Sequence, residues 1–526
     1  MLARISSKLR NLLSTYRARR IARDVATKAE PQGPAVVFFN SSARMGFISQ
    51  NAAFSILSAW GLRLAGVRIV HFICSSGMRR CVLGTNALDP NEEPECNECI
   101  ALSRHLYADA ETRWFGFEER AEIGADIQGM DLAQLTEYSY QDWPLGQLVL
   151  PSLRWALRRH HLEDDKQTRI FFRQYILSAY NVAQEFEQML DAVQPKAVVL
   201  FNGIMFPEAT AALAARRRGL RTITHEVGLR PFTAFFTEGE ATAYPMDIPP
   251  DFQLDAAQNA QLDEYLGNRF QGRFSMAGVQ FWPQMQELGD AFLSKAAQFK
   301  HIVPIFTNVI FDTSQVHANT RFAHMFAWLD ALLPIIRQHQ DTLFVIRAHP
   351  DEMRPNSNKK SRESVAEWVQ ANRVAELPNV IFVDATEYLS SYALIQRSHF
   401  VMVYNSSIGL EASILGKPVL SAGAARYTQY KTVFYPASAD EYLGQVNQFL
   451  AAESLTQPAE MVSEARRVLY YQLYRTALPF GDFLYPHATK GLVHFKDFPT
   501  EALQPENSAA VQAVFDGVIN DKPFLV

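Results

Sequence analysis

The stretch from Leu343 to Gly423 constrains the fold more than any other part of this 526-residue chain. It contains four short, apolar, β-branched segments separated by helical patterns: Leu343–His349, Val380–Ala385, Phe400–Asn405 and Pro418–Ser421. Strands that alternate with helices are typical of βαβ units and of a parallel sheet. We therefore expect an open α/β sheet, in which ligands bind outside the carboxyl ends of the strands.

Two of these predicted strands end in polar residues. Arg347 and His349 close the first strand, and the third leads into a helix start with a second polar set: Asn405, Ser406, Ser407, Gly409 and Glu411. Free backbone N–H groups and the positive end of a helix favour an anionic phosphate. Singly, each residue has a structural explanation, such as a serine N-cap or the extended backbone before a proline. Together they indicate a nucleotide-sugar site, with Glu411 accepting hydrogen bonds from a ribose diol.

Several motifs resemble one known family. YNSSIGLEASILGKPV (residues 404–419), preceded by RAHPDE (residues 347–352), resembles the C-terminal half of bacterial capsule polysaccharide biosynthesis proteins. These are GT-B glycosyltransferases related to the enzymes that transfer Kdo from CMP-Kdo. Residues 302–312 resemble the start of the same half, and residues 198–228 resemble the last βαβ unit of the N-terminal half. The resemblance implies an α/β fold with two Rossmann-like domains that face each other across a cleft.

The residues and the resemblance together predict a division of the chain into four parts. These are a basic amphipathic N-terminal helix (residues 1–30), an N-terminal Rossmann-like domain on the acceptor side with a cysteine cluster and a helical insertion (31–300), a C-terminal Rossmann-like domain that binds the nucleotide-sugar (301–436), and C-terminal helices that cross back to the first domain (437–526).

The activity implied by the resemblance is transfer of a sugar from a nucleotide-sugar, with a CMP-Kdo-like donor expected first, to a bacterial surface polysaccharide or glycolipid. Arg347, His349 and the amides of residues 406–409 would stabilise the departing phosphate, so no catalytic metal is expected. Lys417 would add positive charge there or only shape the turn before the next strand.

His225 and Glu226 lie at the carboxyl edge of another predicted strand, in the N-terminal half. A histidine can shuttle protons near neutral pH, and a carboxylate can act as a base or nucleophile, so both are catalytic candidates. The alternatives are a hydrogen bond from His225 to a neighbouring loop and an ion pair between Glu226 and Arg230.

Two other functions fit the same residues. One is a non-catalytic GT-B module that binds nucleotide-sugars and scaffolds capsule assembly. The other is a glycerophosphotransferase that uses a CDP-alcohol, with His349 and His225 in catalysis. Turnover of the donor separates the binding module from an enzyme, and the identity of the donor separates the two enzymes.

Composition is compatible with these functions. Hydrophobic residues make up 48% of the chain, enough for sizeable cores. The net charge of −5 provides no basic field for nucleic acid, so no nucleic-acid partner is expected. No apolar run approaches the ~20 residues of a membrane span, and no secretory signal is visible, so we expect a cytoplasmic protein.

The first 23 residues are strongly basic, unlike the chain as a whole. They contain no acidic residue and seven cations: Arg4, Lys8, Arg10, Arg17, Arg19, Arg20 and Arg23. Apolar residues recur among them at helical spacing: Leu2, Ile5, Leu9, Leu12, Leu13 and Tyr16. Such a helix can lie on an anionic membrane, here the inner face of the cell membrane, or it can be a leader helix that packs on its own domain.

All four cysteines fall within 26 residues, with the spacing C-x6-C-x14-C-x2-C: Cys74, Cys81, Cys96 and Cys99. A C-x2-C pair with a second pair is typical of thiolate zinc sites, although a six-residue gap is unusual. The alternative is a set of reduced, partly buried thiols, because stable disulfides are rare in the cytoplasm. We expect a structural zinc without a catalytic role, because four thiolates would leave no open position on the metal.

Overall fold

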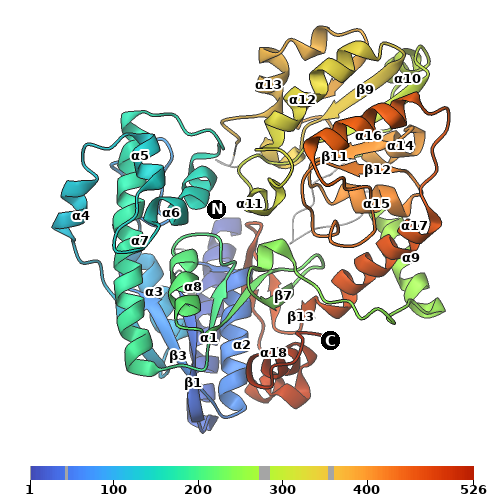
Figure 1. Ribbon diagram of the computed structural model, residues 1–526. Coiled ribbons are helices and arrows are strands. Elements are labelled where there is room, and N and C mark those ends of the chain that lie inside the picture. The colour runs from blue at the N-terminus through green and yellow to red at the C-terminus, as the bar shows by residue number, and fades with distance from the viewer. Residues whose placement is uncertain (1, 42–45, 272–284, 354–359) are drawn as a thin grey trace.

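The computed structural model describes residues 2–41, 46–271, 285–353 and 360–526, with the backbone alone for residues 2–9. Two α/β domains, each with helices on both faces of a sheet, lie side by side (Figure 1). The predicted fold class, with two Rossmann-like domains and a helical insertion in the first, is confirmed.

The sheet of the first domain has seven strands in the order β13-β7-β6-β5-β1-β3-β4. Strands β4, β3, β1, β5 and β6 are parallel; β7 runs antiparallel to β6, and β13 antiparallel to β7. Their bounds are β1 Gln32–Asn40, β3 Val67–Cys74, β4 Glu111–Phe115, β5 Ala197–Phe201, β6 Arg221–Val227, β7 Thr233–Glu238 and β13 Leu478–Pro479.

Alternate side chains of β1 enter two cores on opposite faces of this sheet, as the pleat requires. Val36 and Phe38 pack into the core beneath α1 (Leu2–Lys28), α2 (Gln50–Leu64), α3 (Cys96–Leu106) and α18 (Ala509–Ile519). Val37 and Phe39 pack into the core of the other face. That face is covered by α8 (Glu208–Arg217) and by the helical insertion, which consists of α4 (Ala121–Asp126), α5 (Leu132–Glu137), α6 (Leu145–Leu157) and α7 (Lys166–Val193).

The sheet of the second domain is entirely parallel, in the order β10-β9-β8-β11-β12. Its strands are β8 His301–Phe306, β9 Thr342–Arg347, β10 Val380–Val383, β11 Val401–Val403 and β12 Val419–Ser421. One face packs against α12 (Met325–Gln338), α13 (Val365–Ala371) and α16 (Ala439–Ala451). The other packs against α9 (Ala256–Phe270), α14 (Ser391–Arg397), α15 (Ile408–Ile414) and α17 (Ala459–Tyr470).

The domain limits differ from those expected from the sequence. Helix α9 and the short α10 (Asp290–Ala296) precede residue 300 but belong to the second domain, because Leu262, Leu266 and Ala296 enter the core of its sheet. Helices α16 and α17 likewise stay with the second domain rather than crossing back.

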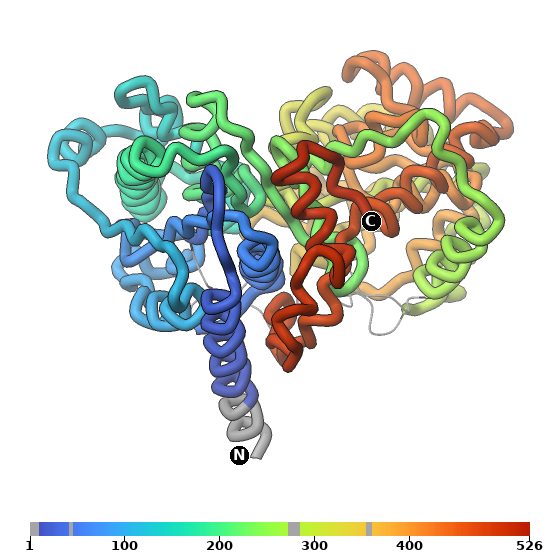
Figure 2. The backbone as a smooth tube through the Cα atoms, turned by 90° about the horizontal axis from the view of Figure 1, so that it is seen from below, coloured from blue at the N-terminus to red at the C-terminus, as the bar shows by residue number. Residues whose placement is uncertain are grey.

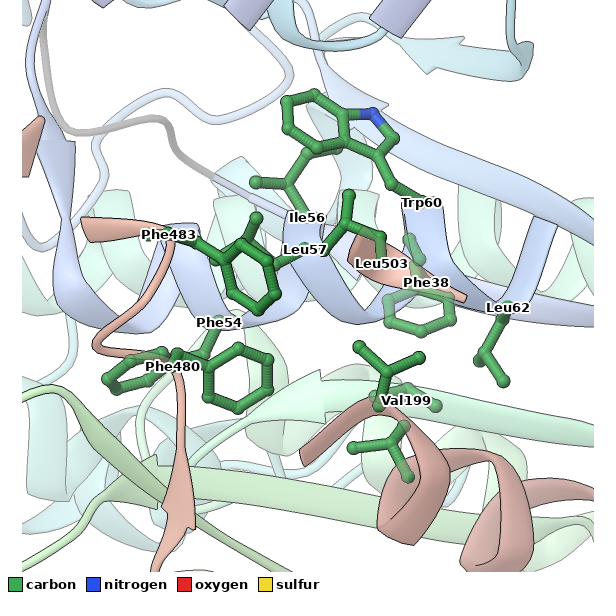
Figure 3. Packing of buried hydrophobic residues seen from close by; sticks show 14 of the residues in the cluster. Phe38, Phe54, Ile56, Leu57, Trp60, Leu62, Val199, Phe480, Phe483 and Leu503 are labelled. Carbon is green, nitrogen blue, oxygen red and sulfur yellow. The ribbon is translucent and has the colours of Figure 1, made fainter. Parts of the chain in front are cut away.

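The chain returns to the first domain only beyond α17. Strand β13 joins the first sheet, and β15 (Leu492–Phe495) pairs with β14 (Leu484–Pro486) and β2 (Ile48–Ser49). Figure 3 shows Phe480, Phe483 and Leu503 packed with Phe54 and Trp60 of α2. The last residues of the chain therefore complete the core that its first residues begin.

Candidate functional site

A cavity of about 570 Å³ lies where the two domains meet. The second domain provides most of its wall, from the carboxyl ends of β8, β9, β11 and β12, and the first domain contributes Leu229, Thr242 and Ala243. This is the position at which open α/β sheets bind their ligands, and the volume suits a small-molecule ligand.

Arg347 and His349 both line this cavity, at the end of β9. Burial lowers the pKa of Arg347 to about 10, so the side chain remains a cation at neutral pH. One of its terminal nitrogens donates to the carbonyl of Glu387 at 3.3 Å. His349 Nδ1 accepts from the amide of Asp351 at 3.1 Å, which places the proton of a neutral ring on Nε2.

The polar residues after β11 line the same cavity. The amide group of Asn405 is held by Asn308, whose Nδ2 lies 2.6 Å from Asn405 Oδ1. Ser406 and Ser407 follow, and the Ser406 carbonyl accepts from the hydroxyl of Tyr427 at 2.6 Å. Among the described residues, the amides of residues 406–408 have no hydrogen-bond acceptor, so they remain available to a ligand.

Glu411 also lines the cavity, but its carboxylate is already engaged by the protein. Oε1 forms an ion pair with Arg269 of α9 at 2.6 Å, and Oε2 accepts from the hydroxyl of Tyr392 at 2.5 Å. Burial opposes the charge of Arg269, but Glu411 outweighs it and raises the pKa of the guanidinium. A ribose could bind Glu411 only by sharing or replacing these partners.

The other two residues predicted to bind the donor do not line the cavity. Gly409 packs beneath the Tyr427 hydroxyl, and a Cβ there would lie 2.3 Å from that oxygen, so glycine is needed for close packing. Lys417 precedes β12, at the amino end of the strand, and donates to the carbonyl of Ser398 at 3.0 Å. Lys417 therefore shapes the turn before β12, and the prediction that it contacts the donor phosphate is wrong.

At the end of β6, His225 is buried and Glu226 is half-buried, and neither lines the cavity. His225 stacks on Phe236 with ring centroids 5.1 Å apart, and burial lowers its pKa to about 3. Such a histidine does not shuttle protons at neutral pH.

Glu226 accepts from the side-chain amides of Asn51 and Asn202, each at 3.0 Å, and burial raises its pKa. The alternative ion pair with Arg230 is not formed among the described residues; that guanidinium lies over the ring of Tyr474. Sequence reasoning therefore placed both candidates at the correct strand edge but not in the cavity.

The cavity residues that sequence reasoning missed include Arg269, Arg426 and His317. Arg426 lies 3.7 Å from the ring centroid of Tyr244, and that tyrosine donates to the carbonyl of Val227. His317 Nε2 lies 2.8 Å from the hydroxyl of Thr242, which joins the two domains at the cavity wall. Arg426 follows β12, so the strand-end rule would have found it.

The four cysteines lie together in the first domain, apart from this site. They are free thiols and line a separate cavity of about 30 Å³. Across the described residues, no group of three or more His, Cys, Asp or Glu side chains is arranged to hold a metal ion.

The fold and the site thus define a protein of two Rossmann-like domains with a cavity between them. Residues 271–430 match the family model described as "Capsule polysaccharide biosynthesis protein". This confirms the family resemblance over these residues, which include every predicted donor-binding residue. The comparison with curated proteins found no match.

Solved structures show distant likenesses. The β-Kdo 2,4 transferase of Thermosulfurimonas dismutans KpsC is 11% identical with a TM-score of 0.36, covering 55% of this chain and 82% of its own. The β-Kdo 2,7 transferase of the same protein is 14% identical with a TM-score of 0.33, covering 64% and 90%. The Neisseria meningitidis UDP-GlcNAc 2-epimerase, bound to UDP-GlcNAc, is 12% identical with a TM-score of 0.22, covering 84% and 99%. At these TM-scores the likenesses assign no activity to this chain.

Proposed function

We propose that this protein is a glycosyltransferase of capsule polysaccharide synthesis, with a nucleotide-sugar donor in the interdomain cavity. The observation that supports this most is the set of phosphate-binding groups in the second-domain wall. Arg347 and Arg426 provide cations, His349 provides a polar ring, and the amides of residues 406–408 provide donors. Cations and backbone amides that converge at strand ends suit the phosphate of a nucleotide.

In the proposed reaction, the protein acts by positioning and electrostatic stabilisation. Negative charge grows on the phosphate as the sugar departs, and preorganised donors that contact it lower the barrier. Arg347 is held by burial and by the Glu387 carbonyl, so it needs little reorganisation. This chemistry requires no divalent metal, and a CMP-sugar such as CMP-Kdo is the donor that we expect first.

Donor binding can be tested by thermal shift with CMP, CMP-Kdo, CMP-sialic acid, CDP-glycerol, UDP and UDP-sugars, with and without EDTA. A ligand that binds only the native state raises the melting temperature by mass action. We expect a CMP species to stabilise the protein with or without EDTA. Arg426→Gln should abolish most of the shift, whereas Lys417→Gln, which removes a cation outside the cavity, should retain it.

Turnover separates the candidate functions. His349→Ala should lower donor-dependent transfer by ~10²–10³ without changing the fold, as for the loss of one preorganised donor. Stabilisation without turnover in the native protein would indicate the non-catalytic scaffold. Selective stabilisation and turnover of CDP-glycerol would indicate the glycerophosphotransferase, and no shift with any nucleotide would contradict the proposed site.

We also propose that α1 attaches the protein to an anionic membrane surface, where a glycolipid or growing polysaccharide would be met. One face of α1 packs on the first domain through Ala18, Ile21 and Val25, which are fully buried. The opposite face is exposed: Leu12 is 68% and Tyr16 is 67% accessible. The predicted apolar residues Leu2, Ile5 and Leu9 and the cations Arg4 and Lys8 lie outside the described side chains.

The rest of α1 supports the membrane proposal. The helix projects from the body of the first domain (Figure 2). Arg10, Arg19 and Arg20 are exposed, with Arg20 paired to Asp497 at 2.6 Å, and no acidic residue precedes Asp24. Within the described parts of the chain, no helix is both long and apolar enough to span a membrane. Apolar insertion combined with attraction of cations to anionic lipid is the usual basis of such peripheral attachment.

A further inference from the structure

We propose that the four cysteines of the first domain bind one structural zinc ion. They come from three places: Cys74 ends β3, Cys81 lies in the loop 75–95, and Cys96 and Cys99 occupy the first turn of α3. All four line one cavity of about 30 Å³. This is the size of one or two water-sized spheres, so it has room for a single ion but not for a larger cluster.

Backbone amides already point at two of the sulfurs. The Gly77 amide lies 3.3 Å from Cys74 Sγ, and the Gly84 amide lies 3.2 Å from Cys81 Sγ. In both cases the donor lies three residues after the cysteine, so one local turn recurs around the cavity. N–H groups directed at sulfur stabilise metal-bound thiolates and orient the ligands.

Arg80, the residue before Cys81, is a buried cation. Arg80 is only 1% exposed, and its guanidinium donates to the side chain of Gln174 and to the carbonyls of residues 84, 90 and 92. All these acceptors are neutral, and no acidic side chain pairs with Arg80 among the described residues. A buried charge is costly without an opposite charge, and zinc with four thiolates, one of them from the adjacent Cys81, would carry a net negative charge.

The loop 75–95 has the length and irregularity of a segment that a metal ion would hold in place. It contains no helix or strand, and structureless loops longer than ~12–15 residues are uncommon in compact domains. In the described structure, no three of these cysteines are arranged to hold a metal ion. Zinc binding therefore requires the thiols to move inward. The irregular loop that carries Cys81 can provide this shift.

Zinc binding would also change the protonation of the cluster. Burial raises the pKa of Cys74, and it raises the pKa of Cys81 to about 11, so these side chains are neutral thiols at physiological pH. Zinc binds thiolates, and it therefore releases protons as it binds. The interdomain cavity shares no lining residue with this cavity, so the test below is independent of the proposed transferase activity.

The test is the metal content of the full chain, purified without chelator and measured by elemental analysis. We expect one zinc ion per chain, reduced at least tenfold in Cys81→Ser and in Cys99→Ser. Met78→Leu is the matched control, because Met78 lines the same cavity without a thiol, and it should retain its zinc. Cobalt(II) added to the zinc-depleted chain should give the thiolate charge-transfer band and the intense visible bands of a tetrahedral site.

Folding of the variants does not limit this test, because cobalt is added to the native sequence. A folded native chain that carries no zinc, has four titratable thiols and gives no cobalt–thiolate spectrum would overturn the proposal. Zinc that remains in both serine variants would also overturn it, since the metal would then be bound elsewhere. Iron with acid-labile sulfide in place of zinc would contradict the choice of a single ion.

Discussion

At the scale of single residues, burial decides which predicted groups can titrate. His225 is 1% exposed, and its low pKa has one physical cause, the loss of hydration on burial. A histidine has a pKa of about 6.5 in an unfolded chain. Between that value and about 3, the unfolded state therefore binds a proton that the folded state does not.

This difference predicts that the protein becomes less stable as the pH is lowered below ~6.5. The contribution of His225 is present above pH ~6.5 and is lost as the pH decreases, because stability rises with pH where the unfolded state binds more protons. Its share of the loss between pH 7 and pH 5 is roughly 2 kcal/mol. His225→Phe, which can stack on Phe236, should remove this share in urea unfolding at the two pH values. Equal losses in the variant and the native protein would contradict the burial of a neutral histidine.

The strand-end rule explains which site residues were predictable. Arg347, His349 and the polar residues after β11 reach the cavity because the carboxyl ends of parallel strands meet at one edge. Lys417 was assigned incorrectly because it precedes its strand and so lies at the opposite edge. Arg269 could not be predicted, since its partner Glu411 is far away in the chain and only the packing of α9 joins them.

At the scale of elements, α1 presents different chemistry on its two faces. Removing the whole helix would delete core residues such as Ala18 and Ile21, so point changes are the better test of attachment. We expect Leu12→Glu combined with Tyr16→Glu to lower binding to phosphatidylglycerol vesicles at least tenfold. Each change removes an apolar side chain worth ~1.5–3 kcal/mol when fully buried and adds a charge that anionic lipid repels.

The control for this experiment is another exposed leucine. Leu88 is 80% accessible and lies in the loop 75–95, so Leu88→Glu makes the same type of change away from α1. Binding measured by co-sedimentation should be unchanged in that variant and weak for all proteins on phosphatidylcholine. Equal binding of the α1 variant and the native protein to anionic vesicles would contradict the proposed contact of this face with lipid.

A helix or strand could be predicted where residues within the segment itself determine its structure, and not where pairing with a distant segment does. The central strands were predicted within a few residues because parallel strands buried on both faces form short, continuous apolar runs. By contrast, β13 has only two residues, Leu478 and Pro479, and is a strand only because it pairs with β7. Helix α17 ends at Tyr470, where a π-helical turn, Tyr471–Arg475, replaces its continuation.

At the scale of the whole molecule, a second contact joins the domains away from the cavity. The loop after α6 reaches the second domain, where Glu363 accepts from the amides of His160 and His161 at 2.8 and 2.9 Å. His161 Nδ1 lies 2.5 Å from the same carboxylate, and its Nε2 lies 3.2 Å from His324 Nε2. The loop that carries His160 and His161 is therefore part of a domain interface.

The hydrogen bonds determine where the protons lie in this contact. His324 Nδ1 accepts from the amide of Ala327, so a neutral His324 carries its proton on Nε2 and donates to His161. His161 must then carry its own proton on Nδ1 and donate to Glu363. Burial raises the pKa of Glu363, but these donors outweigh it and lower the pKa, so the residue accepts as a carboxylate. His161 of the first domain thus accepts a hydrogen bond from His324 and donates one to Glu363, both in the second domain.

We therefore expect His161→Ala to loosen the domains without unfolding either one. The variant loses a hydrogen bond to a charged acceptor, worth ~1.5–3 kcal/mol, so local opening should become at least tenfold more frequent. Hydrogen exchange should be faster in residues 158–164 and 361–364, while the strands of both sheets keep their protection. His339→Ala is the matched control, because its contact with Asn447 lies within the second domain. Unchanged exchange at both segments in His161→Ala would contradict a role of this imidazole in holding the domains, and would leave the backbone bonds to Glu363 as the contact that matters.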